Sequence, residues 1–155
     1  MPAEFDTADA EPSSAEYSTA WVAYALQATG AFGFFLGPLI GLVISYVRRD
    51  ADGAGYLASH HRWLIRTFWW TLAGYLACLA VILAGVWPIA SDLVREAIRS
   101  GGHAREFSFG IAWDSIFATI GAAMLGGLGM VVVWIWNAYR ILRGGFLLAD
   151  RSPTA

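Results

Sequence analysis

Three long segments without a charged residue constrain this chain more than any other feature of its sequence. Residues 20–47, 67–90 and 115–139 contain no Asp, Glu, Lys or Arg. About 20 apolar residues make a helix that crosses the roughly 30 Å hydrocarbon core of a bilayer. Lipid offers no partner for backbone N–H and C=O groups, so a spanning segment without a barrel pattern is helical. Each segment therefore predicts one membrane-spanning helix, and the expected fold is an all-α, integral membrane three-helix bundle.

The composition supports lipid as the surrounding solvent. Charged residues make up 14% of the 155 residues, against about 25% in soluble domains. A soluble domain of this length cannot bury so much apolar surface, because its surface-to-volume ratio is too high. The net charge of −2 and the single Cys78 exclude a basic nucleic-acid binder and a disulfide-stabilised scaffold.

The remaining residues divide the chain into tails and loops. Residues 1–19 hold five acidic residues and no basic one, which is typical of a disordered, solvated N-terminal tail. Residues 20–150 form the expected transmembrane domain, followed by a short C-terminal tail at 151–155. Within the loop over 91–110, residues 92–101 predict a short amphipathic helix that lies in the membrane interface.

Arginine gives the expected orientation, because the chain contains no lysine. Seven arginines lie within 48–66 and 140–151, and three lie in the loop over 91–110. Three crossings place these two sets on opposite sides of the membrane. We therefore expect an N-terminus outside and a cytoplasmic C-terminus. All eight tryptophans fall near span ends, as in the aromatic belts of membrane proteins.

Small residues spaced four apart predict close helix packing within the membrane. The packing interface favours an intramolecular bundle, and self-association into a homo-oligomer is the alternative. Pro38 predicts a kink in the first span, because it lacks a backbone N–H. The expected helix-packing residues are Gly33, Gly37, Gly41, Ala118, Ala122 and Gly126.

A group of arginines marks the expected inner face. On a helix, Ser59, Arg62 and Arg66 share one face, while Trp63 turns towards lipid. Guanidinium groups bind phosphate through paired hydrogen bonds, so we expect contacts to anionic lipid headgroups or to an acidic partner segment. Snorkelling of arginines that only set the topology is the alternative. The candidate anion-binding residues are Arg48, Arg49, Arg62, Arg66, Arg140 and Arg143.

Other chemistry has little support in the sequence. His60 and His61 are adjacent, so their side chains diverge on a helix, and no His, Cys and acid cluster has metal-ligand spacing. The sequence contains no Ser-His-Asp constellation, nucleophile elbow, P-loop or dinucleotide fingerprint. We therefore expect no enzymatic activity, no cofactor and no metal.

Three stretches carry a resemblance to a known family. Residues 40–50 read IGLVISYVRRD, residues 59–69 read SHHRWLIRTFW, and residues 139–150 begin with YRILRG and end with LAD. The chain resembles uncharacterised small inner-membrane proteins of proteobacteria over roughly residues 20–150. Those proteins are distantly similar to the membrane domain of a chloroplast protein-import translocon subunit. The chain differs in its longer charged loop over 91–110 and in lacking a fourth span.

The resemblance implies a multi-span protein of the bacterial inner membrane and no assigned reaction. We expect a non-enzymatic accessory or scaffold subunit that packs against a larger membrane protein or against itself. The alternative is an oligomeric transport or translocation component, since three spans are too few to enclose a pore alone.

Overall fold

The computed structural model describes residues 13–34, 36–51, 56–99 and 113–154, and no strand occurs among them. The expected all-α class is confirmed. The expected three-helix bundle is not confirmed, because the described residues form four α-helices and one 3₁₀ turn. The elements are α1 (Ser14–Thr29), η2 (Gly30–Phe32), α2 (Leu36–Ala51), α3 (Tyr56–Arg99) and α4 (Trp113–Ala149).

The chain forms two units. One contains residues 1–72 and 134–155, and the other contains residues 73–133. The first unit therefore holds α1, η2, α2, the beginning of α3 and the end of α4. The second unit holds the remaining parts of α3 and α4.

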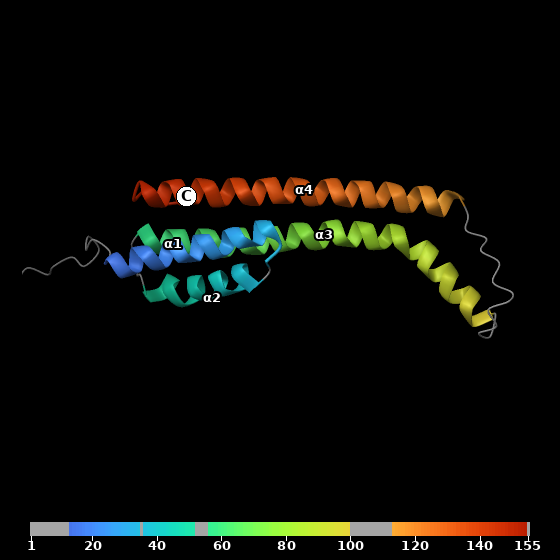
Figure 1. The fold of residues 1–155 in the computed structure, drawn as a ribbon, viewed down its shortest axis with the longest axis horizontal. Helices are drawn as coiled ribbons and strands as arrows, with labels where there is room; N and C mark the ends of the chain where they lie inside the picture. Colours follow the sequence, from blue (N-terminus) through green and yellow to red (C-terminus); the bar gives the residue numbers. More distant parts are fainter. Residues whose placement is uncertain (1–12, 35, 52–55, 100–112, 155) are drawn as a thin grey trace, which may run out of the picture. The chain divides into compact units, whose positions relative to one another are not determined.

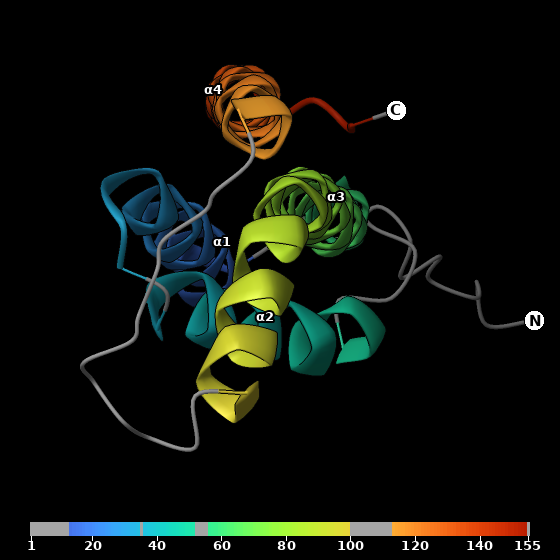
Figure 2. The same ribbon diagram turned by 90° about the vertical axis from the view of Figure 1, so that its right-hand side faces the viewer.

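Residues 20–47 form a helical hairpin and not one helix, which corrects the first expected span. The helices α1 and α2 run side by side in opposite directions (Figures 1 and 2). Two of the expected packing glycines lie in this contact. A Cβ atom at Gly37 would lie 2.8 Å from the carbonyl oxygen of Leu26, and one at Gly41 would lie 3.1 Å from that of Ala23. These glycines therefore let the two helices of one chain approach closely.

The hairpin turns at Gly33, whose φ of +87° suits a residue without a side chain. Gly33 ends η2 and lies outside α2, so the three expected glycines do not share a single helix face. Pro38 occupies the first turn of α2, where the missing N–H has no intrahelical partner. It therefore marks a helix start and not the kink expected from the sequence.

The helix α1 begins inside the expected acidic tail. Ser13 caps it through a capping box, in which its hydroxyl accepts from the Glu16 amide and the Glu16 carboxylate accepts from the Ser13 amide. This reciprocal pair satisfies two donors that a helix start leaves without partners. Residues 14–19 are thus helical, and the tail over 1–12 lies outside the described residues.

The end of α4 lies beside the beginning of α1. The Tyr17 hydroxyl donates to the carbonyl oxygen of Leu148 across 3.3 Å, and Tyr24 would contact a Cβ atom at Gly144. The prediction that the two termini lie on opposite sides assumed three crossings. Residues 20–47 turn back within the structure, and these contacts place the start of α1 beside the end of α4 in the first unit. The orientation in the membrane stays a prediction.

In the second unit, α3 and α4 pack through small residues. A Cβ atom at Gly126 would lie 2.9 Å from the carbonyl oxygen of Cys78, and one at Gly85 would meet Ala122 and lie 3.3 Å from the carbonyl oxygen of Ala118. The Thr119 hydroxyl donates to the carbonyl oxygen of Gly85 across 2.7 Å. The three expected packing residues of α4 therefore face α3 of the same chain.

The helix α3 continues well beyond the span expected at 67–90. It runs to Arg99 and bends in its yellow-green part (Figure 1), where Pro88 removes a backbone donor. The expected separate interfacial helix over 92–101 is thus the continuation of α3 as far as Arg99. Residues 100–112 lie outside the described residues.

Among the described residues, two helices are long and apolar enough to span a membrane. They are α3, with 44 residues, and α4, with 37. Within the most apolar stretch of each, 0% and 6% of the residues are buried in the chain. The helices α1 and α2 have 16 residues each and fall short of the length that a crossing needs.

Candidate anion-binding site

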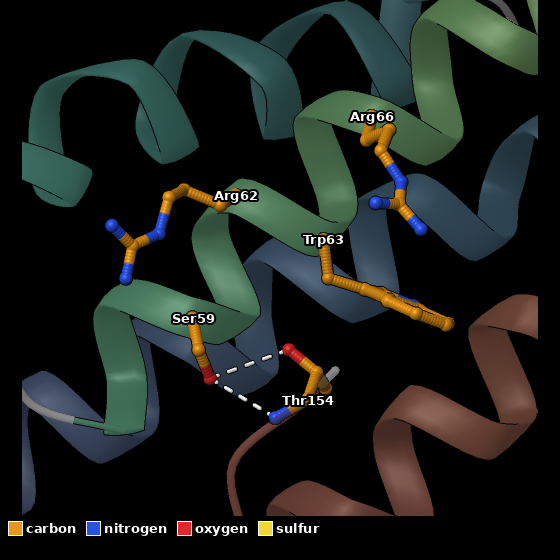
Figure 3. A pocket seen from close by; sticks show the side chains of 5 residues that line it. All are labelled: Ser59, Arg62, Trp63, Arg66 and Thr154. Carbon is orange, nitrogen blue, oxygen red and sulfur yellow. Dashed lines mark hydrogen bonds between the residues drawn. The ribbon is translucent and has the colours of Figure 1, made fainter.

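A pocket of about 260 Å³ opens beside the first turns of α3. We call it the arginine pocket, and its lining residues are Ser59, Arg62, Trp63, Arg66 and Thr154 (Figure 3). Four of them come from one helix, and Thr154 comes from the segment after α4. Residues 59, 62, 63 and 66 fall on one side of a helix because it turns once every 3.6 residues.

The two arginines of the pocket differ in conformation. Arg66 lies near Trp63, with its Cζ atom 5.8 Å from the ring centroid, and Arg62 extends away from that ring (Figure 3). Both residues are exposed. Guanidinium groups one helical turn apart on an exposed face are able to approach the same ligand, because the side chains are long and rotate freely.

The residues after α4 form a wall of the pocket, which we call the C-terminal strap (Ser152–Thr154). The Thr154 amide donates to Oγ of Ser59 across 3.0 Å, and the Thr154 hydroxyl donates to the same atom across 3.3 Å. The Ser59 hydroxyl in turn donates to the carbonyl oxygen of Tyr56. Ser59 therefore holds the strap, and its hydroxyl proton is already used in the hydrogen bond to Tyr56.

A buried histidine holds the strap at a second point. Nε2 of His60 lies 3.0 Å from the carbonyl oxygen of Ser152, and Nδ1 lies 2.9 Å from the hydroxyl of Tyr24. A carbonyl oxygen only accepts, so Nε2 carries the proton, and the Tyr24 hydroxyl donates to Nδ1. His60 is completely buried and connects α1 to the strap.

The reversal of the chain at the strap is a Schellman motif. The Ser152 amide donates to the carbonyl oxygen of Leu147, and the Arg151 amide donates to that of Leu148. Arg151 has a φ of +51°, in a conformation where glycine is usual. Because no glycine stands at this position, the turn could not be predicted from the sequence.

Trp63 packs against Arg140, which corrects the expectation that it turns towards lipid. Cζ of Arg140 lies 3.7 Å from the Trp63 ring centroid, and the Trp63 indole N–H donates to the carbonyl oxygen of Arg140 across 3.3 Å. Nε of Arg140 donates to Thr67 across 2.9 Å. One terminal nitrogen of Arg140 is buried without a hydrogen-bond partner among the described residues.

The six candidate arginines are only partly brought together. Arg62 and Arg66 line the pocket, while Arg140 lies behind Trp63 and interacts electrostatically with Arg66 and Arg143. Arg48 lies near the end of α2 and acts electrostatically on Glu16. The side chain of Arg49 lies outside the described residues.

The arrangement suits an anion better than a metal. No group of three His, Cys, Asp or Glu residues in the described part of the chain could hold a metal ion. The pocket instead offers two cationic side chains beside an aromatic ring.

Comparisons with known proteins found no family model, no curated protein and no solved structure that matches this chain. The resemblance to the inner-membrane family therefore stays a prediction.

Proposed function

We propose that this protein is a non-enzymatic accessory or scaffold subunit of a membrane assembly and that its arginine-bearing end contacts anionic lipid headgroups. The observation that carries the proposal is the exposure of the apolar stretches of α3 and α4, of which 0% and 6% are buried. Apolar surface of this extent is unfavourable in water, because burial is worth about 25 cal/mol per Å². A bilayer supplies the missing apolar surroundings.

We propose a topology in which the start of α1 and the end of α4 both lie on the cytoplasmic side. Each helix of the hairpin has 16 residues and a length of about 24 Å, which is shorter than the hydrocarbon core. Phe32 and Phe34, at its turn, are 81% and 68% exposed, which favours a re-entrant hairpin with an apolar tip. Arg48, Arg62 and Arg140 lie at this end, and the bias of arginine towards the cytoplasmic side supports its placement there.

Contact with anionic lipid follows from the same placement. Juxtamembrane arginines are attracted to the negative surface of the cytoplasmic leaflet, by about 1 kcal/mol each. The five residues that line the arginine pocket include no acidic side chain and carry only the two guanidinium charges. This electrostatic pairing would orient the protein and hold its cytoplasmic end at the headgroup layer.

The accessory role is favoured over an oligomeric transport component because several glycines pack against helices of the same chain. The transport alternative requires a helix face of small residues for self-association. Gly37 and Gly41 contact α1, and Gly126 contacts α3, so these positions are covered within one chain. The long exposed apolar faces of α3 and α4 remain for lipid or for a larger membrane protein.

Extraction and cross-linking in native membranes test the proposal. The protein should stay in the membrane pellet after alkaline carbonate treatment, and cross-linking should join it to a different membrane protein. Release into the alkaline supernatant would contradict membrane integration. A discrete homo-oligomer as the sole cross-linked product would contradict the accessory role and favour the transport alternative.

A further inference from the structure

We propose that the arginine pocket binds a single phosphomonoester group. The inference rests on the proposed contact with anionic lipid and adds a defined ligand chemistry at a defined site. It distinguishes a stoichiometric binding site from a diffuse attraction between arginines and a charged surface.

The hydrogen-bond donors left in the pocket are cationic. The Ser59 hydroxyl donates to Tyr56, and the Thr154 hydroxyl and amide both donate to Ser59. The Trp63 indole N–H donates to the carbonyl oxygen of Arg140. The guanidinium groups of Arg62 and Arg66 therefore provide the donors for a ligand, which selects an anion that accepts several hydrogen bonds.

The charge of the pocket matches a phosphomonoester better than a phosphodiester. Its lining residues are two arginines, two hydroxyl residues and a tryptophan, so its formal charge is +2. A phosphomonoester carries a charge of about −1.5 to −2 at pH 7 and presents three strong acceptor oxygens. A phosphodiester carries a single charge and has two unesterified oxygens. The two planar guanidinium groups can donate hydrogen bonds to all three phosphomonoester oxygens, and their two positive charges balance its second negative charge.

Binding would require Arg62 to turn towards Arg66. In Figure 3 the Arg62 guanidinium points away from the Trp63 ring, while the Arg66 guanidinium lies close to it. Arg62 is exposed, so rotation about its side-chain bonds meets little packing resistance. An anion bound to Arg66 would attract the guanidinium of Arg62, whose Cα lies one helical turn away.

The size and surroundings of the pocket favour a phosphate carried by a lipid. Its volume of about 260 Å³ is below the roughly 300–1,000 Å³ of sites that enclose a whole drug-sized ligand. Trp70 follows Arg66 by one helical turn and is 63% exposed. The acyl chains of a bound lipid would lie along this apolar surface. An acidic peptide would instead present carboxylates, each of which carries a single negative charge.

Native mass spectrometry of the full chain in detergent tests the inference. The probes are phosphatidic acid, phosphatidylglycerol and phosphatidylcholine with the same acyl chains, and glycerol 3-phosphate is added as a soluble phosphomonoester. We expect one phosphatidic acid per chain, with an apparent affinity about tenfold above that of phosphatidylglycerol. Glycerol 3-phosphate that binds as tightly as phosphatidic acid would assign the site to a soluble ligand and overturn the lipid source.

Matched variants connect binding to the pocket. Arg62→Gln with Arg66→Gln should abolish the preference for phosphatidic acid. Arg95→Gln with Arg99→Gln should retain it, because these arginines have the same spacing on α3 and pair with Asp92 and Glu96. Arg62→Lys with Arg66→Lys keeps the charge without the planar fork and should bind less tightly than the parent.

The outcomes separate this inference from the proposed function. Equal retention of phosphatidic acid and phosphatidylglycerol, or an unchanged preference in the Arg62→Gln, Arg66→Gln variant, would overturn the phosphomonoester site and leave the general lipid contact standing. Equal retention of all three lipids would overturn both. An acidic peptide that displaces phosphatidic acid at stoichiometric concentration would overturn the lipid in favour of a protein partner.

Discussion

The hydroxyl of Tyr24 on α1 donates a hydrogen bond to Nδ1 of His60 on α3 across 2.9 Å. Both side chains are buried, with exposed fractions of 3% and 0%. Because Nε2 of His60 donates to the Ser152 carbonyl oxygen, the pair connects the hairpin to the C-terminal strap. These two hydrogen bonds of one buried histidine thus join three segments that are far apart in the sequence.

Removing this hydroxyl should destabilise the first unit. Tyr24→Phe leaves Nδ1 of His60 buried without its donor, which costs about 1–3 kcal/mol. Tyr139→Phe is the matched control, because Tyr139 is exposed on α4. Denaturant unfolding in detergent micelles should show a lower free energy of unfolding for the first variant only. An equal effect of the two variants would mean that the Tyr24 hydroxyl has no special structural role.

Adding a methyl group at the hairpin contact should also destabilise the fold. In Gly37→Ala the new Cβ would lie 2.8 Å from the Leu26 carbonyl oxygen, whereas at Gly121 nothing lies within 4 Å. We expect a loss of about 1–3 kcal/mol at position 37. Gly121→Ala should gain up to about 1 kcal/mol from helix propensity. Thermal unfolding in micelles measures both, and a neutral Gly37→Ala would contradict the close approach of α1 and α2.

The stacking of Arg140 on Trp63 gives a third prediction. Arg140→Gln removes the cation from the ring at 3.7 Å and the hydrogen bond from Nε to Thr67. The free energy of unfolding should fall by about 1–3 kcal/mol. Arg143→Gln, at an exposed position, should change it by less than about 0.5 kcal/mol. The same denaturant titration compares them, and reversed magnitudes would contradict a structural role for Arg140.

The start of α1 should respond to acid. Hydrogen bonds from the Ser13 backbone and side chain lower the pKa of Glu16 below its ordinary value of 4.5. A carboxyl whose pKa is lowered by folding stabilises the helix above its unfolded pKa, and this contribution is lost as the pH falls through the folded pKa. Amide chemical shifts of Tyr17 should therefore report fraying in acid, at pH values below the ordinary glutamate pKa of 4.5. Glu16→Gln should remove most of this dependence.

The sequence predicts the long helices and misses the hairpin for a physical reason. Uncharged runs identify 67–90 and 115–139, which lie within α3 and α4. The run over 20–47 has the same hydropathy whether it crosses once or turns back, so composition alone does not reveal the break at Gly33. Pro38 was the available signal, because proline favours the first turn of a helix over its interior.

The site is predictable only where helix geometry determines it. The spacing of Ser59, Arg62 and Arg66 places them along one pocket. The strap has no comparable signal, because Ser152 and Thr154 act there largely through a backbone carbonyl and a backbone amide, which any residue provides. The position of Trp63 beside Arg140 depends on a tertiary contact between α3 and α4, which neither segment encodes locally.

Cysteine accessibility in intact cells tests the membrane placement of the hairpin most directly. With Cys78 replaced by alanine, single cysteines would stand in place of Ser18, Ile98 or Ala149, all of which are exposed. A membrane-impermeant thiol reagent added from outside should label position 98 alone, because the proposed topology puts the start of α1 and the end of α4 on the cytoplasmic side. Labelling of positions 18 and 98 together, with 149 protected, would restore a single crossing over 20–47 and contradict the re-entrant hairpin.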